Sequence, residues 1–137
     1  MNGVVFGRLD FSSSLSKGRE FIDSDYVKGV VLDVSGKCKE RGIEFVLGGG
    51  ISVKSIDFMR ELSKVHLTRF ETRKCIFDSV ILNSGNSATV LLQAVNLELL
   101  WLNAKRNYYK SIAKEGDQRI EALEERHLYE IKGNNYT

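Results

Sequence analysis

The chain of 137 residues contains no proline and has only two cysteines, two histidines and one tryptophan. Cys38 and Cys75 lie far apart and lack the spacing of metal ligands, so we expect two reduced thiols. No apolar run approaches the roughly 18–20 residues of a transmembrane helix, and the first residues show no signal-peptide pattern. The sequence therefore predicts a cytoplasmic protein that does not enter a membrane.

An excess of charge of one sign is also missing. Basic and acidic residues are interspersed and leave a net charge of +2, although 28% of the residues are charged. This pattern lacks the basic footprint of a protein that binds nucleic acid or a membrane surface. Hydrophobic residues make up 42% of the chain, which at this length is enough for one domain with a core.

Strand-like and helical patterns alternate along the first part of the chain. The expected elements are, in order, a strand at 3–9, a polar loop at 10–23, a helix at 25–41, a strand at 43–49, a helix at 53–65 and a strand at 66–73. This order predicts an α/β fold of right-handed βαβ units with parallel strands. Three such strands form part of a (β/α)₈ or TIM barrel, in which the chemistry lies at the carboxyl ends of the strands.

From about residue 87 the pattern is helical to the end, so we divide the chain into a barrel portion at 1–85 and a helical arm at 86–137. Two apolar stripes follow this arm, and a helix that is apolar on two sides is buried on two sides. The stripes consist of Ala88, Leu91, Leu92, Val95, Leu99 and Leu102, and of Ala94, Leu97, Trp101, Ala104 and Tyr108. One stripe is expected to pack on a partner subunit, which predicts a homo-oligomer.

The stretch GVVFGRLDFSSSLSKG at 3–18 resembles the signature of the HpcH/HpaI aldolase and citrate lyase beta-subunit family. The signature has an apolar strand, a glycine, two residues, an aspartate, an apolar residue and a serine-rich loop that ends near a glycine. The expected elements up to residue 75 follow the family's order. The resemblance implies the C-terminal half of the family's barrel, followed by a long helix that swaps between subunits.

The resemblance also implies an activity, which is metal-dependent cleavage or formation of a carbon–carbon bond in a 2-oxo acid such as pyruvate or oxaloacetate, or in an acyl-CoA ester. Asp10 matches the family's ligand to Mg²⁺ or Mn²⁺, and the amides of Leu9 and Asp10 match those that hold the substrate carboxylate. Arg8 matches the citrate lyase branch, and Leu47 lies near a position that lines the substrate channel. The family's metal-binding glutamate and catalytic arginine lie upstream of the signature, so we expect an incomplete enzyme and assign no catalytic residue.

Each candidate site residue also has a plain structural interpretation. Asp10 is either a metal ligand or an aspartate that caps a turn, and Arg8 pairs either a substrate carboxylate or a neighbouring acid. The run of glycines Gly48, Gly49 and Gly50 before Ser52 either binds a phosphate or only permits a tight turn.

Strand alternation sends Arg69, Glu71 and Arg73 to one face, where they either bind an acidic substrate or form an ion-pair ladder. Glu71 is also considered as a substitute metal ligand. Two further functions stay open beside the lyase: an assembly module that acts through its C-terminal helices, and a phosphate-binding barrel half that uses residues 48–50.

Overall fold

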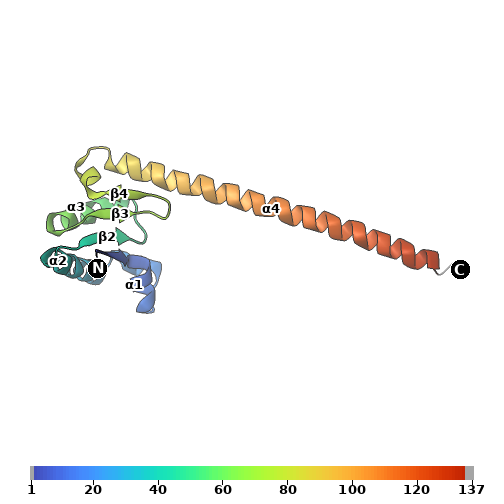
Figure 1. Ribbon diagram of the computed structural model, residues 1–137, viewed down its shortest axis with the longest axis horizontal. Coiled ribbons are helices and arrows are strands. Elements are labelled where there is room, and N and C mark those ends of the chain that lie inside the picture. Colours follow the sequence, from blue (N-terminus) through green and yellow to red (C-terminus); the bar gives the residue numbers. More distant parts are fainter. Residues whose placement is uncertain (1, 135–137) are drawn as a thin grey trace. The chain divides into compact units, whose positions relative to one another are not determined.

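The computed structural model describes residues 2–134, and the chain divides into one compact unit up to Glu98 and a second from Leu99 onward. The first unit is an α/β structure built on one four-stranded sheet with the order β1-β2-β3-β4 (Figure 1). The strands are β1 (Gly3–Gly7), β2 (Glu44–Gly48), β3 (Arg69–Glu71) and β4 (Ile76–Asp78). The α/β class predicted from the sequence is therefore confirmed.

The sheet is mixed, whereas the sequence pattern predicted parallel strands throughout. Strands β1, β2 and β3 are parallel, but β4 runs antiparallel to β3. The chain reverses at a tight turn in which the amide of Thr72 donates to the carbonyl of Cys75 at 2.9 Å, and the amide of Cys75 donates to Thr72 Oγ1 at 3.2 Å. A threonine side chain that accepts a hydrogen bond from a nearby backbone amide in this way favours a turn over a continuing strand. The strand expected at 66–73 is therefore present but shorter, as β3, and the residues after the turn open the next element, β4, instead of extending it.

The helices confirm most of the expected pattern. They are α1 (Arg8–Ser14), α2 (Asp25–Glu40), α3 (Ile56–Val65) and α4 (Ser87–Asn134), with short 3₁₀ helices η1 (Arg19–Asp23), η2 (Val53–Ser55) and η3 (Ser79–Asn83). Ser24 caps α2, because its Oγ accepts a hydrogen bond from the amide of Val27 at 3.3 Å. The prediction of a polar loop at 10–23 is wrong, since α1 and η1 occupy most of that segment. In α1, Arg8 and Ser12 lie one turn apart and are both buried, so tertiary packing overrides the loop preference of the serines.

The core lies on the face of the sheet that α2 and α3 cover. Phe45, Leu47 and Phe70 are fully buried in one hydrophobic cluster with apolar residues of both helices. Leu47 pairs with Phe70 across β2 and β3, so their side chains share this face.

The other face of the sheet has a different character. Side chains alternate along a strand, so Val5, Val46, Arg69 and Ile76 point away from the helices. Val5 is 62% exposed and Ile76 is 68% exposed, and Val46, although buried, is not part of the main hydrophobic cluster. This surface, which we call the open face, carries polar and apolar side chains together.

The turn after β2 confirms the expected glycine-rich connection and explains its glycines. Gly49 and Gly50 have φ angles of +86° and +67°, which L side chains rarely adopt. Gly49 also packs against the start of α1, because a methyl group there would lie 2.6 Å from the amide nitrogen of Arg8 and 2.7 Å from that of Leu9. The turn therefore needs glycine for both its conformation and its packing.

The second unit, described as far as Asn134, is a single helical segment, the continuation of α4. The sequence predicted helix to the end of the chain, and the residues from 135 onward lie outside the described part. Within residues 2–134, no helix is both long and apolar enough to cross a membrane.

We expect Gly49→Ala to lower the free energy of unfolding by about 3 kcal/mol, because it combines left-handed backbone strain with a backbone clash. The matched control is Gly42→Ala, where φ is +66° but no atom lies within 4 Å of the added methyl group. The control should lose only the strain energy, about 1–2 kcal/mol. Urea denaturation measures both, and equal losses would show that the contact with α1 contributes nothing.

Candidate active site at the carboxyl edge of the sheet

The three parallel strands end at Gly7, Gly48 and Glu71, and parallel strands place their carboxyl ends on one edge of a sheet. The expected candidates near Asp10, the glycine turn and the end of β3 are therefore brought to the same edge. Contacts between them follow directly, because Gly49 packs on the amides of Arg8 and Leu9, and Gly48 packs on the side chain of Glu71.

Arg8 is buried beneath this edge, with a side-chain exposure of only 1%. Its Nε donates to the carbonyl of Gly49 at 3.0 Å, and one terminal nitrogen donates to the carbonyl of Gly50 at 3.0 Å and to Ser55 Oγ at 3.2 Å. The other terminal nitrogen lies 3.3 Å from Asp23 Oδ1. Of the two interpretations of Arg8, the structure shows the pairing with a neighbouring acid, and the guanidinium also holds the glycine turn.

The charge of Arg8 costs free energy in this position. Burial lowers the pKa of the Arg8 guanidinium, and the charge of Asp23 and its hydrogen bond raise that pKa part of the way back. An arginine remains protonated under such a shift. The buried cation is thus stabilised by two backbone carbonyls, a hydroxyl and one partly exposed carboxylate.

Asp10 lies in the first turn of α1, three residues after the end of β1, and is exposed. Its carboxylate reaches back to the strand, since a methyl group on Gly7 would lie 3.0 Å from Asp10 Oδ2. The carboxylate is therefore accessible at the carboxyl edge, as a ligand for a cation would have to be.

The remaining predicted site residues are placed differently. Leu9 is half-buried next to Gly49, and Leu47 is fully buried in the core rather than on an accessible wall. Ser52 belongs to the first turn of the next helical segment, where its amide donates to Ser55 Oγ at 3.2 Å. The carbonyls of Gly49 and Gly50 face Arg8, so this turn is bonded inward to the protein.

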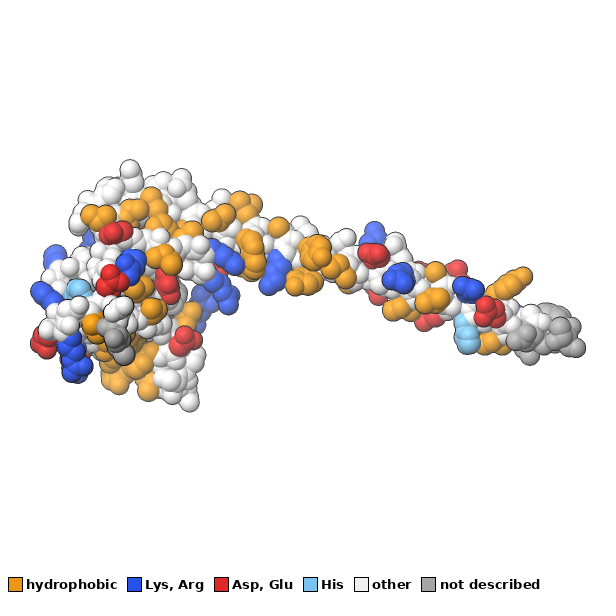
Figure 2. Space-filling model, viewed as in Figure 1, with side chains coloured by type: hydrophobic (Ala, Val, Ile, Leu, Met, Phe, Trp, Pro, Cys, Tyr) orange, Lys and Arg blue, Asp and Glu red, His pale blue; other side chains and the backbone are white. Residues whose placement is uncertain are grey.

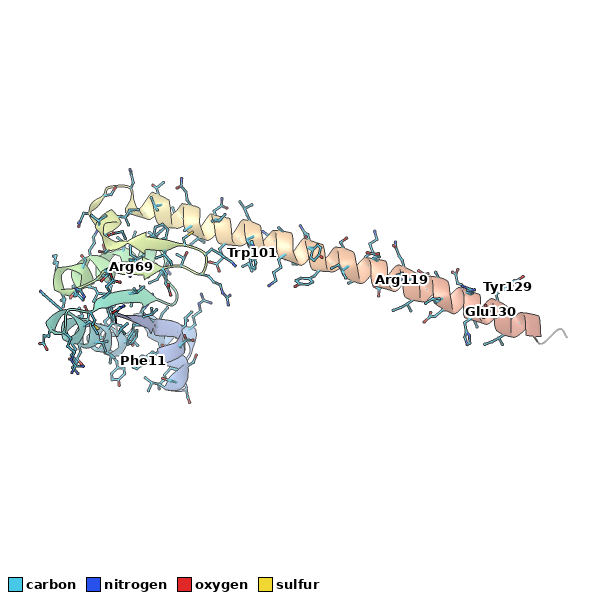
Figure 3. The ribbon with its side chains drawn as sticks, viewed as in Figure 1. Phe11, Arg69, Trp101, Arg119, Tyr129 and Glu130 are labelled. Atoms are coloured by element: carbon cyan, nitrogen blue, oxygen red, sulfur yellow. The ribbon has the colours of Figure 1, made fainter. Side chains whose placement is uncertain are left out.

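The charged residues of β3 separate into different environments. Arg69 forms an ion pair with Glu44 on the open face, where Figure 3 labels it. Glu71 is half-buried at the end of β3, and Arg73 is exposed in the turn that follows. Among the described residues the ion pair of β3 thus joins Arg69 to Glu44 and does not form a ladder with Glu71 and Arg73. The sequence did not single out Glu44, since 25 residues separate it from Arg69.

The chemistry of the carboxyl edge is compatible with Mg²⁺ or Mn²⁺. These ions prefer oxygen ligands, and Mg²⁺ is usually held by one or two carboxylates together with water and oxygens of the substrate. Asp10 supplies an accessible carboxylate, and Glu71 ends on the same edge. Among residues 2–134, however, no three His, Cys, Asp or Glu side chains gather into a metal-binding group.

Comparison with known proteins gives no relative: no family model matches the chain, and neither a curated protein nor a solved structure matches it. The resemblance to the HpcH/HpaI family therefore stays a prediction from the residues at 3–75.

We expect Arg8→Met to lower the free energy of unfolding by about 3–5 kcal/mol. The substitution leaves the carbonyls of Gly49 and Gly50 and the hydroxyl of Ser55 without their hydrogen-bond donor. Asp23→Asn is the control, since the side chain of Asp23 is 56% exposed. The loss in this variant should be smaller, because the guanidinium keeps its bonds to the two carbonyls and to the hydroxyl. Chemical denaturation compares the two, and a loss in the methionine variant no larger than in the asparagine variant would contradict this role.

Proposed function

We propose that this chain is part of a metal-dependent lyase that cleaves or forms a carbon–carbon bond in a 2-oxo acid or an acyl-CoA ester. In this proposal the first unit is a portion of a (β/α)₈ barrel in a cytoplasmic enzyme, and Asp10 is one ligand of Mg²⁺ or Mn²⁺. The observation that carries the proposal is the position of Asp10, which is exposed at the shared carboxyl edge of three parallel strands.

The surrounding residues support this role by fixing the edge. Arg8 ties the first turn of α1 to the carbonyls of Gly49 and Gly50, so the segment that bears Asp10 is attached to the end of β2. The bound metal ion would supply Lewis-acid stabilisation of negative charge on the substrate's oxygen. The first turn of α1 places the carboxylate of Asp10 over Gly7, and in the proposal the amides of Leu9 and Asp10 hold the substrate carboxylate.

Binding of Mn²⁺ and pyruvate should raise the melting temperature of the protein, and the two together should raise it more than either alone. A ligand present at about 100 times its Kd adds about 2.7 kcal/mol to the folded state, which corresponds to a shift of several degrees. Asp10→Ala should abolish the joint rise, because it removes the carboxylate ligand. Differential scanning calorimetry provides the measurement.

Asp33→Asn is the matched control, since Asp33 is an exposed aspartate on α2 that pairs with Lys37 in the next turn. This variant should keep the joint rise. If the unaltered protein shows no joint rise, or if Asp10→Ala keeps it, the lyase proposal is wrong.

A second function, assembly with another copy of the chain, is favoured by the exposed side chains of the second unit. Trp101, Tyr108, Ile112 and Leu123 follow one side of the helix at 100° per residue, and all are exposed. Figure 2 shows hydrophobic side chains on the surface of this helix, with charged ones between them. Apolar surface of this extent typically marks an interaction site, and we propose that a second copy covers it.

Ile112→Lys should raise the dissociation constant of self-association at least tenfold, since burial of an isoleucine side chain is worth about 1.5–3 kcal/mol. The control is Leu128→Lys, because Leu128 is 57% exposed but lies on the opposite side of the helix. Analytical ultracentrifugation would show this difference. A monomeric parent protein, or equal effects of the two variants, would refute the assembly proposal.

A further inference from the structure

We propose that the second unit binds a second copy of the chain as an antiparallel coiled coil, in which Arg106 of each copy forms an ion pair with Glu130 of the other. This inference rests on the assembly proposal above and adds the direction of the partner helix and the residues that select it. It is carried by the spacing of the apolar residues along α4 and by the places of the charged residues among them.

A line of residues spaced alternately three and four apart runs along α4 from Leu99 to Glu130. This line, which we call the seam, consists of Leu99, Leu102, Arg106, Tyr109, Ala113, Gly116, Ile120, Leu123, His127 and Glu130. All of its large apolar side chains are exposed. An apolar repeat of this spacing, sustained over more than roughly three to four heptads, is the pattern of a coiled coil, in which two helices bury their seams against each other.

The seam borders the surface proposed above for assembly. It shares Leu123 with that surface and is flanked by Ile112, whereas Leu128 lies away from it. A partner helix that packs on the seam therefore also covers Ile112.

The charged residues of the seam oppose a parallel arrangement of the two helices. In a parallel pair each seam residue faces the same residue of the other copy, so Arg106 would face Arg106 and Glu130 would face Glu130. Like charges that face each other across an interface are unfavourable, and here both ends of the seam would have them.

An antiparallel arrangement centred near Gln118 replaces both like-charge pairs with unlike ones. Arg106 lies twelve residues before this centre and Glu130 lies twelve residues after it, so each Arg106 faces the Glu130 of the other copy. The two-fold symmetry of the pair repeats this contact at both ends of the overlap. The charges of the seam are therefore complementary to those of a second copy in one direction only.

The sizes of the residues near the centre fit the same arrangement. Ala113 then faces Leu123 of the other copy, and Gly116 faces Ile120. Small residues opposite large ones fill the space between two helices. In the parallel arrangement Gly116 would face Gly116 and leave a gap, which loses packing energy.

The two charged residues are free to change their present contacts. Arg106 donates to Asn103 Oδ1 at 3.1 Å, and Glu130 Oε1 lies 3.3 Å from the Nε of Arg126. Both contacts are exposed and lie within one turn of the same helix, so they contribute little to stability. A carboxylate also accepts more than one hydrogen bond, so Glu130 can keep Arg126 while it binds Arg106 of the other copy.

The charges that flank the seam do not select a direction. Glu124 would face Lys110 in the antiparallel arrangement and Arg119 in the parallel one, and each arrangement also brings some like charges together. The residues within the seam therefore determine the direction.

A series of charge exchanges, followed by analytical ultracentrifugation of the full chain, tests the pairing. Arg106→Glu and Glu130→Arg each place like charges opposite each other at both ends of the overlap, so each should raise the dissociation constant of self-association at least about tenfold. The double variant pairs unlike charges again, and its dissociation constant should return to within about threefold of the parent's. Lys114→Glu is the control, because Lys114 is exposed on α4 outside the seam; it should leave the dissociation constant unchanged.

The other outcomes separate this pairing from assembly as such. In a parallel pair neither single exchange changes the number of like-charge contacts, so single variants that associate as tightly as the parent would overturn the antiparallel pairing and leave assembly intact. Single variants that weaken association without recovery in the double variant would also overturn it, since the two residues would not be partners. A monomeric parent chain would refute the assembly proposal and, with it, the coiled coil.

Discussion

The burial of one cation, the guanidinium of Arg8, is the constraint on which the architecture of the candidate site depends. A buried charge is tolerated only when it is paired and fully hydrogen-bonded. Arg8 meets this demand with two carbonyls of the glycine turn, a hydroxyl of the segment before α3 and a carboxylate at the end of η1. One side chain thereby connects the start of α1 with the end of η1 and with the segment from the glycine turn to η2, and Asp10 lies in the helix that is attached in this way.

The sheet has two chemically distinct faces: one packs in the hydrophobic core, and the other carries the candidate site residues. The face beneath α2 and α3 holds Phe45, Leu47 and Phe70 and accounts for the core. The open face carries an ion pair, two carboxylates and a few exposed apolar side chains. Because side chains alternate along each strand, the same short strands supply the residues of both faces.

Much of the fold follows from sequence periodicity alone. The period of α2, the apolar run of β2 and the helical pattern from residue 87 each predicted an element close to the observed one. The failures occur where tertiary contacts decide the outcome. The serines after Asp10 have loop propensity, yet burial of Arg8 and Ser12 makes that stretch helical. A side-chain bond in the turn after Glu71 ends the third strand early, and the next strand runs antiparallel to it.

The candidate site was only partly visible in the sequence for the same reason. The position of Asp10 after a strand and before a serine-rich segment was a sufficient signal for the carboxyl edge. The partners of Arg8 lie 15–47 residues away, so no local pattern identifies them. The position of Glu71 over Gly48 depends on the register between β2 and β3, which periodicity does not determine.

Because β4 runs antiparallel to β3, the two edges of the sheet differ in the kind of strand that can be added to them. Beyond β3 the parallel order is already terminated, because the next strand runs the opposite way and is only three residues long. On the other side, β1 is an edge strand with neither proline nor a charged residue, the two features that commonly prevent strand addition. A further strand that continues the parallel run of β1, β2 and β3 can therefore join only beside β1, because β4 already occupies the other side of that run.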